Sequence, residues 1–143
     1  MRTLFDTSVL VATLVDQLAN HEAAFGAFVR YTSDGHVGYC SAHTLAEAYA
    51  TLTALPIAKR ISPEEARVLV EETLIGRLTV VPLALNDYQS VLRQVAALGL
   101  SSGAIYDALH AHCALKEGVD QILTYNFSDF TRFPLQGVTL ALP

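Results

Sequence analysis

The chain has 143 residues, and we expect residues 1–143 to form one domain of ordinary size. Hydrophobic residues make up 52% and charged residues 16%, which predicts a substantial core and excludes extensive disorder. The formal net charge of −5 argues against broad binding of duplex nucleic acid, which basic proteins usually perform. It leaves room for an enzyme that holds nucleic acid through metal ions and a few arginines.

Short apolar strands alternate with helical segments along the first half of the chain. We expect a buried strand at 2–5, helices at 7–17 and 20–31, a strand at 36–41 and a helix at 43–54. Ser62, Pro63 and Glu65 predict the start of a helix that runs to about residue 75. They supply a capping serine, a proline at the first helical position and a glutamate at the third.

The same alternation continues to the end of the chain. We expect a strand at 78–81, a helix capped by Asn86 with Gln89 in the reciprocal position, a helix at 104–116 stopped by Gly118, and strands at 121–124 and 138–141. Strands separated by helices indicate parallel pairing with right-handed crossovers. The sequence therefore predicts a three-layer α/β/α sandwich with a mainly parallel central sheet.

Neither membrane insertion nor disulfide formation is indicated. No apolar run reaches the ~18 residues that a membrane span requires, and the N-terminus lacks a signal-peptide pattern, so we expect a cytoplasmic protein. Cys40 and Cys113 lie far apart in apolar surroundings, which indicates buried free thiols.

Four acidic residues occupy positions that predict a shared site. Asp6 ends the first strand, Asp129 follows the strand at 121–124, and Glu47 and Asp107 lie early in helices among apolar neighbours. Ligands bind at the carboxyl ends of the strands in open α/β sheets. An unpaired buried carboxylate is costly, and neither of the two lysines is near in sequence. A cation from solution is the expected partner.

The predicted chemistry is cleavage of phosphodiester bonds. Carboxylate oxygens suit Mg²⁺, with Mn²⁺ as a substitute, and such an ion turns its bound water into a hydroxide-like nucleophile. Thr7 or Ser8 would place a hydroxyl near that water, and Asn126 would orient a ligand. A solvated surface charge is the alternative for any single acid, but it explains four such acids poorly.

These residues together resemble a known family. The segments Leu4-Phe5-Asp6-Thr7-Ser8-Val9-Leu10, Tyr106-Asp107-Ala108 and Leu123-Thr124-Tyr125-Asn126-Phe127-Ser128-Asp129-Phe130, with the embedded Glu47, resemble a PIN domain, and most nearly the VapC-type toxins of toxin–antitoxin pairs. The resemblance covers essentially the whole chain. It implies a Mg²⁺-dependent endoribonuclease whose acids match Asp6, Glu47, Asp107 and the segment from Asn126 to Asp129. It also implies a homodimer and a cognate antitoxin, and a basic side chain of that partner would enter the acidic pocket.

One position departs from the family pattern, since many members have Asp where this chain has Asn126. If the segment forms a helical turn, Asn126 and Asp129 share a face and both look toward the site. Asp129 would then be a metal ligand, and Asn126 would hold a carboxylate or a water. The alternative is that Asp129 caps the local turn.

Other assignments fit the sequence less well. His110 and His112 point in different directions on a helix, so they cannot share a zinc ion, although His110 lies three residues from Asp107. A haloacid-dehalogenase-like phosphatase would need a second Asp where Ser8 stands. A catalytically inactive PIN-like binding module remains an alternative. Lys59, Arg60 and Arg132 are candidates for basic residues near the cleft, and a solvated surface charge is the alternative for each.

Overall fold

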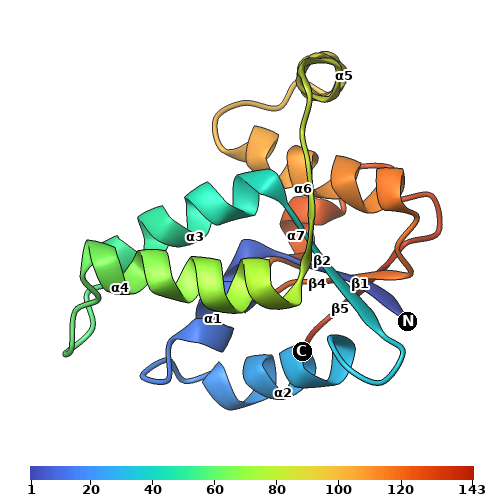
Figure 1. The fold of residues 1–143 in the computed structure, drawn as a ribbon. Coiled ribbons are helices and arrows are strands. Elements are labelled where there is room, and N and C mark those ends of the chain that lie inside the picture. The colour runs from blue at the N-terminus through green and yellow to red at the C-terminus, as the bar shows by residue number, and fades with distance from the viewer.

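A five-stranded sheet, parallel throughout, forms the centre of the computed structural model, which describes all of residues 1–143 (Figure 1). The strands lie in the order β3-β2-β1-β4-β5. Their bounds are β1 Arg2–Phe5, β2 Val37–Ser41, β3 Thr79–Val81, β4 Gln121–Leu123 and β5 Thr139–Ala141. In register, Leu4 of β1 lies opposite Tyr39 of β2 and Ile122 of β4. The predicted parallel α/β architecture is confirmed.

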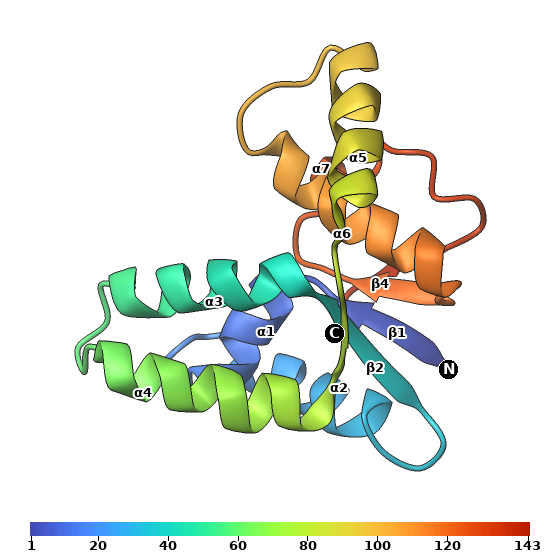
Figure 2. The ribbon, with the colours of Figure 1, turned by 45° about the horizontal axis from the view of Figure 1, so that its top comes forward.

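Helices cover both faces of this sheet. They are α1 Thr7–Leu14, α2 His21–Tyr31, α3 Ala42–Ala54, α4 Pro63–Val68 with its π-helical continuation η1 Leu69–Ile75, α5 Leu85–Ala97, α6 Ala104–Glu117 and α7 Phe127–Phe130. Figure 1 shows α2 and α6 on opposite sides of the sheet. In Figure 2, α3 and α4 run side by side away from the strands, and α5 lies against α6. None of the helices is long and apolar enough to cross a membrane.

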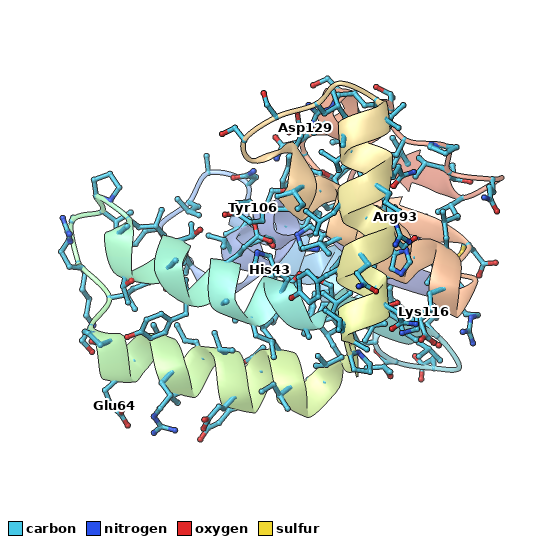
Figure 3. All side chains as sticks on the ribbon, turned by 90° about the horizontal axis from the view of Figure 1, so that it is seen from above. His43, Glu64, Arg93, Tyr106, Lys116 and Asp129 are labelled. Carbon is cyan, nitrogen blue, oxygen red and sulfur yellow. The ribbon has the colours of Figure 1, made fainter.

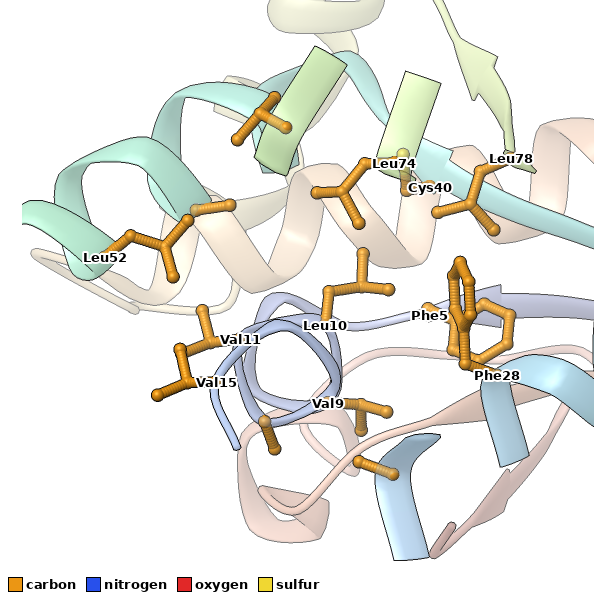
Figure 4. Packing of buried hydrophobic residues seen from close by; sticks show 14 of the residues in the cluster. Phe5, Val9, Leu10, Val11, Val15, Phe28, Cys40, Leu52, Leu74 and Leu78 are labelled. Atoms are coloured by element: carbon orange, nitrogen blue, oxygen red, sulfur yellow. The ribbon is translucent and has the colours of Figure 1, made fainter. Parts of the chain in front are cut away.

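Alternation along the strands divides the core into two clusters. Phe5 and Cys40 point to the face covered by α1 to α4, where Leu10, Phe28 and Leu74 also pack (Figure 4). On the other face, Leu4, Tyr39, Val81 and Ile122 pack with residues of α5, α6 and α7. Both cysteines are buried and free, as predicted, and burial raises the pKa of each thiol to about 12. The two cores fix the sheet rigidly between its helices.

The order of the strands reverses beside β1. The chain proceeds outward from β1 through β2 to β3, then returns to place β4 on the other side of β1. In open parallel sheets, this reversal leaves a crevice at the carboxyl ends of the two central strands, where ligands bind. Asp6 follows β1 and Thr124 follows β4, so the chain places two polar side chains at this point.

Most predicted helix boundaries agree with the structure, and one cap assignment is wrong. Ser62 and Glu65 form the expected reciprocal cap. The helix assigned to Asn86 begins instead at Leu85, after Ala84. The carboxylate of Asp87 accepts a hydrogen bond from the backbone N–H of Ala84 at 2.8 Å. Asp87, at the third helical position, therefore caps the helix although the N-cap residue Ala84 has no polar side chain.

Three further differences concern the ends of elements. The first helix stops at Leu14 rather than at residue 17, and β4 stops at Leu123. The segment after β4 forms the short helix α7, which the strand and helix pattern did not include as an element. Gly118 ends α6 as predicted, with a left-handed φ of 61°.

Candidate active site

Asp6 is the most tightly held acid of the predicted site. Its side chain is buried at the N-terminus of α1, where Oδ1 accepts a hydrogen bond from Thr7 N at 2.8 Å. Oδ2 accepts hydrogen bonds from Ser8 Oγ at 2.7 Å and from Thr124 Oγ1 at 2.8 Å. The link to Thr124 joins the ends of β1 and β4 across the reversal of strand order. These three hydrogen bonds fix the direction of the Asp6 carboxylate.

Asp107 lies on α6, where its surroundings disfavour the ionised carboxylate. Burial, the negative charge of Asp6 and that of Asp129 together raise its pKa to about 6, against the opposing effects of His110 and Arg132. The side chain is 22% exposed, and its Oδ2 lies 3.3 Å from Arg132 Nη2. Asp107 therefore lies near enough to Asp6 and to Asp129 for their charges to act on it, and Arg132 faces both Asp107 and Asp129.

The segment after β4 contributes Asn126 and Asp129 from one helical turn. Asp129 N donates a hydrogen bond to Asn126 O at 3.1 Å, which confirms the predicted turn. Asn126 occupies the N-cap position, yet its side chain makes no capping hydrogen bond, while its N–H donates to Thr124 Oγ1 at 2.9 Å. Asp129 is 43% exposed, and its Oδ1 lies 3.7 Å from Arg132 Nη2. Neither side chain serves to cap α7, so both are available to a ligand.

Glu47 reaches the site from α3 and is held by histidine. Its Oε1 lies 2.6 Å from His110 Nε2 and 3.8 Å from His43 Nε2. His110 lies three residues after Asp107 on α6, so the two helices bring Glu47 and Asp107 to neighbouring positions.

An aromatic pair lies between the helices that carry these two acids. The rings of His43 on α3 and Tyr106 on α6 stack with centroids 4.8 Å apart and planes inclined by 19°. Figure 3 shows the two side chains next to each other, with Glu64 on the far edge of α4. Tyr106 is 45% exposed and immediately precedes Asp107, so its ring forms part of the rim of the site.

The candidate ligands suit a hard divalent cation, although the acids do not form a complete coordination shell. All candidate ligands are oxygens, as Mg²⁺ prefers, and the hydroxyl of Thr7 is buried without a hydrogen-bond partner beside Asp6. No three His, Cys, Asp or Glu side chains lie close enough together to form a metal-binding cluster. Mg²⁺ keeps several waters and needs only one or two direct carboxylates, so Asp6 and Asp107, with Asp129 nearby, fit it.

Of the three basic residues named for the cleft, the structure places Arg132 at the site and the other two elsewhere. Arg132 faces Asp107 and Asp129, which corrects the expectation that these acids have no cation nearby. Lys59 and Arg60 lie in the loop that joins α3 to α4, away from the strands, and neither pairs with the acids (Figure 2). His112 contacts Asp87 at 2.8 Å, so it points away from His110, as predicted.

The buried polar residues Ser41 and Thr44 were not assigned from the sequence. Both contact His110 Nδ1, Ser41 Oγ at 2.8 Å and Thr44 Oγ1 at 3.4 Å. The only sequence signal for them is a serine at the end of a strand followed by a helix, which is typical of an ordinary cap. That signal carries no information about a partner on α6.

The family follows from this fold and these residues. The family model of the PIN domain matches residues 3–134, so the chain belongs to the PIN domain family. It is 33% identical over 109 residues to Ribonuclease VapC27 of Mycobacterium tuberculosis, a match that covers 76% of this chain and 74% of that protein. It is 32% identical over 113 residues to Ribonuclease VapC40 of the same species, covering 79% and 78%.

Solved structures share the fold at lower identity. VapC20 of Mycobacterium tuberculosis, described as a toxin that cleaves the sarcin–ricin loop, superposes with a TM-score of 0.68 at 17% identity, covering 84% of this chain and 86% of that one. VapBC2 of Rickettsia felis, bound to a DNA fragment from its promoter, gives a TM-score of 0.67 at 17% identity, covering 99% and 98%. These likenesses support the fold.

Proposed function

We propose that this protein is a Mg²⁺-dependent endoribonuclease and the toxin of a toxin–antitoxin pair. The observation that carries the proposal is the position of Asp107 at the reversal of strand order, where burial, together with the negative charges of Asp6 and Asp129, raises its pKa to about 6. Repelling acids in a partly buried site are stabilised by a divalent cation. Relatives named as ribonucleases at about a third identity support RNA as the substrate.

The reaction is hydrolysis of an RNA phosphodiester bond. Water adds to phosphorus, the bond from phosphorus to one ribose oxygen breaks, and that oxygen takes up a proton. A bound divalent cation supplies activation of water and neutralisation of charge on the phosphate. Asp6 and Asp107 would hold the cation, and Glu47 and Asp129 would supply further oxygen ligands.

Other side chains position the reactants. Ser8 and Thr124 fix the Asp6 carboxylate through hydrogen bonds of 2.7 and 2.8 Å. The unpartnered hydroxyl of Thr7 is free to orient water beside Asp6. Arg132 faces Asp107 and Asp129 in the absence of substrate and is placed to turn toward the charge of a phosphate. Asn126 has an amide without a capping partner, which suits holding water or a carboxylate.

The proposed assembly has three components. The protein is a homodimer, it acts on RNA, and a cognate antitoxin inhibits it. The VapBC structures that share this fold support the antitoxin. The chemistry of the site supports the mode of inhibition, because an arginine or lysine of the partner would neutralise the same acids that hold Mg²⁺.

The test is cleavage of a single-stranded or structured RNA by the purified protein with Mg²⁺, with Mn²⁺ and with a chelator. Cleavage is expected with either metal and not with the chelator. The matched control is Glu64→Gln, which removes a surface carboxylate on α4 far from the site and should leave the rate unchanged (Figure 3). Cleavage that persists in the chelator contradicts the proposed metal dependence. RNA binding without cleavage at any metal concentration would favour a catalytically inactive binding module.

A further inference from the structure

His110 is a buried titratable residue that the proposed mechanism does not yet use. Its side chain is 1% exposed on α6, and its two ring nitrogens contact residues from different elements. Nε2 lies 2.6 Å from Glu47 Oε1 on α3, and Nδ1 lies 2.8 Å from Ser41 Oγ at the end of β2. A histidine that merely fills space needs neither contact at such short distances.

The partners of the ring determine where its proton lies. The carboxylate of Glu47 only accepts, so Nε2 carries a proton and donates it. Ser41 Oγ accepts a hydrogen bond from Thr44 N at 3.2 Å, which leaves its own hydrogen free to donate to Nδ1. The chain of donors therefore runs from the backbone of α3 through Ser41 and His110 to Glu47. Both ring nitrogens of His110 therefore have hydrogen-bond partners.

The chain begins and ends on α3. Ser41 is the N-cap of α3, and Glu47 lies on the same helix, so the imidazole spans from the start of the helix to its second turn. Ser41, Thr44 and His110 are all buried, whereas the Glu47 side chain is 26% exposed. The buried ring thus anchors an acid whose end reaches the site. Without it, Glu47 would have three rotatable bonds and only His43 at 3.8 Å nearby.

We propose that His110 is the positioning residue of Glu47: it fixes one carboxylate oxygen through its Nε2–H, so that the other oxygen, Oε2, is left to serve the divalent cation. The inference rests on the proposed function, since it assigns Glu47 to the same metal site. It parallels the outer hydrogen bonds that orient metal-ligating carboxylates in other proteins. Loss of such a partner typically weakens metal binding about 10- to 100-fold.

The experiment measures Mn²⁺ binding by electron paramagnetic resonance, without RNA, in wild type and in two variants of His110. His110→Leu fills the space without a donor, and His110→Gln restores an N–H near the position of Nε2. We expect His110→Leu to weaken Mn²⁺ binding by about 10-fold or more, and His110→Gln to recover most of the affinity. The matched control is His112→Gln on the same helix, whose partner is Asp87 and whose Mn²⁺ affinity should equal that of wild type.

A double-mutant cycle separates positioning from a general effect on the fold. If His110 acts through Glu47, the double variant His110→Leu/Glu47→Gln binds Mn²⁺ no more weakly than Glu47→Gln alone. Additive losses would assign His110 to the packing of α6 and overturn the inference. So would a folded His110→Leu protein with wild-type affinity. Wild-type protein that neither binds Mn²⁺ nor cleaves RNA would instead overturn the proposed function itself.

Discussion

Arg132 Nη2 lies 3.3 Å from Asp107 Oδ2 and 3.7 Å from Asp129 Oδ1, so one arginine faces two acids of the candidate site. The Arg132 side chain is 34% exposed and follows α7 directly. In this position the guanidinium neutralises part of the charge that would otherwise attract a metal ion. The proposed metal ion would therefore compete with Arg132 for these acids.

Removing this competitor should strengthen metal binding. We expect Arg132→Gln to bind Mn²⁺ about 2- to 5-fold more tightly in the absence of RNA, as partly exposed ion pairs contribute about 0.2–1 kcal/mol. Isothermal titration measures the change, with Arg93→Gln on the outer side of α5 as the control (Figure 3). Weaker binding in Arg132→Gln would mean that the arginine organises the acids rather than competes for them.

The raised pKa of Asp107 predicts how stability depends on pH. A carboxyl whose pKa rises from 3.8 to about 6 on folding binds its proton more tightly in the folded state. Stability of the metal-free protein therefore falls as pH rises from about 4 to 6, by ~1–3 kcal/mol from this group. Asp107→Asn should remove the fall and be at least as stable as wild type at pH 7.

Thermal unfolding between pH 5 and 7.5 checks this prediction. The pKa of Asp87 is held well below its usual range by the Ala84 N–H, His112 and Lys116, so Asp87 stays ionised there and adds no trend of its own. Added Mg²⁺ should stabilise wild type more than Asp107→Asn. A wild-type protein whose stability is flat across this range would show that folding does not raise the pKa of Asp107.

Substitutions of Asn126 and Asp129 should change different kinetic quantities of RNA cleavage. We expect Asp129→Ala to raise the Mg²⁺ concentration needed for half-maximal cleavage, because it removes a charge that acts on Asp107. We expect Asn126→Ala to lower the maximal rate, because its amide has no structural partner at the cap. The measurement is the cleavage rate against Mg²⁺ concentration. Unchanged metal dependence in Asp129→Ala, with a lower melting temperature, would assign Asp129 to the stability of α7.

The proposed assembly makes a prediction about size and inhibition. Light scattering at micromolar concentration should give the mass of a dimer, and an antitoxin should inhibit through one basic residue that enters the acidic pocket. Replacing that arginine or lysine by alanine should relieve inhibition more than it reduces binding. A strictly monomeric protein contradicts the first part, and a complex whose acidic pocket is empty contradicts the second.

The sequence predicts the architecture well because it depends on local patterns. Ser62 with Glu65 marks a helix start and Gly118 a helix end, and short apolar strands between helices imply parallel pairing. Asn86 misled because a favoured capping residue stood one position inside the helix, while Asp87 capped from the third position. Two good capping residues in a row leave the boundary ambiguous without the tertiary contacts of Asp87.

The residues of the site are only partly predictable from the sequence, for a different physical reason. Glu47 and Asp107 stand out because charge among apolar neighbours is costly in any fold, and Asp6 stands out because it ends a strand. His110, Ser41 and Arg132 acquire their roles from contacts between elements distant in sequence, such as the 2.8 Å link from β2 to α6. Such contacts depend on the packing of α3 against α6, which no spacing along the chain encodes. The sequence therefore identifies the acids, and the structure identifies the residues that contact them.

Acids at the end of β1 and at the start of α6 are proposed to hold a divalent cation that supports RNA cleavage. The most direct test is single-turnover RNA cleavage at saturating Mg²⁺ by wild type, Asp6→Asn and Asp107→Asn, with folding checked by circular dichroism. We expect folded variants, with Asp107→Asn as stable as wild type, and cleavage reduced by at least about 100-fold, the scale on which loss of one charge-stabilising group acts. A folded Asp107→Asn protein that cleaves RNA at the wild-type rate would contradict this proposal.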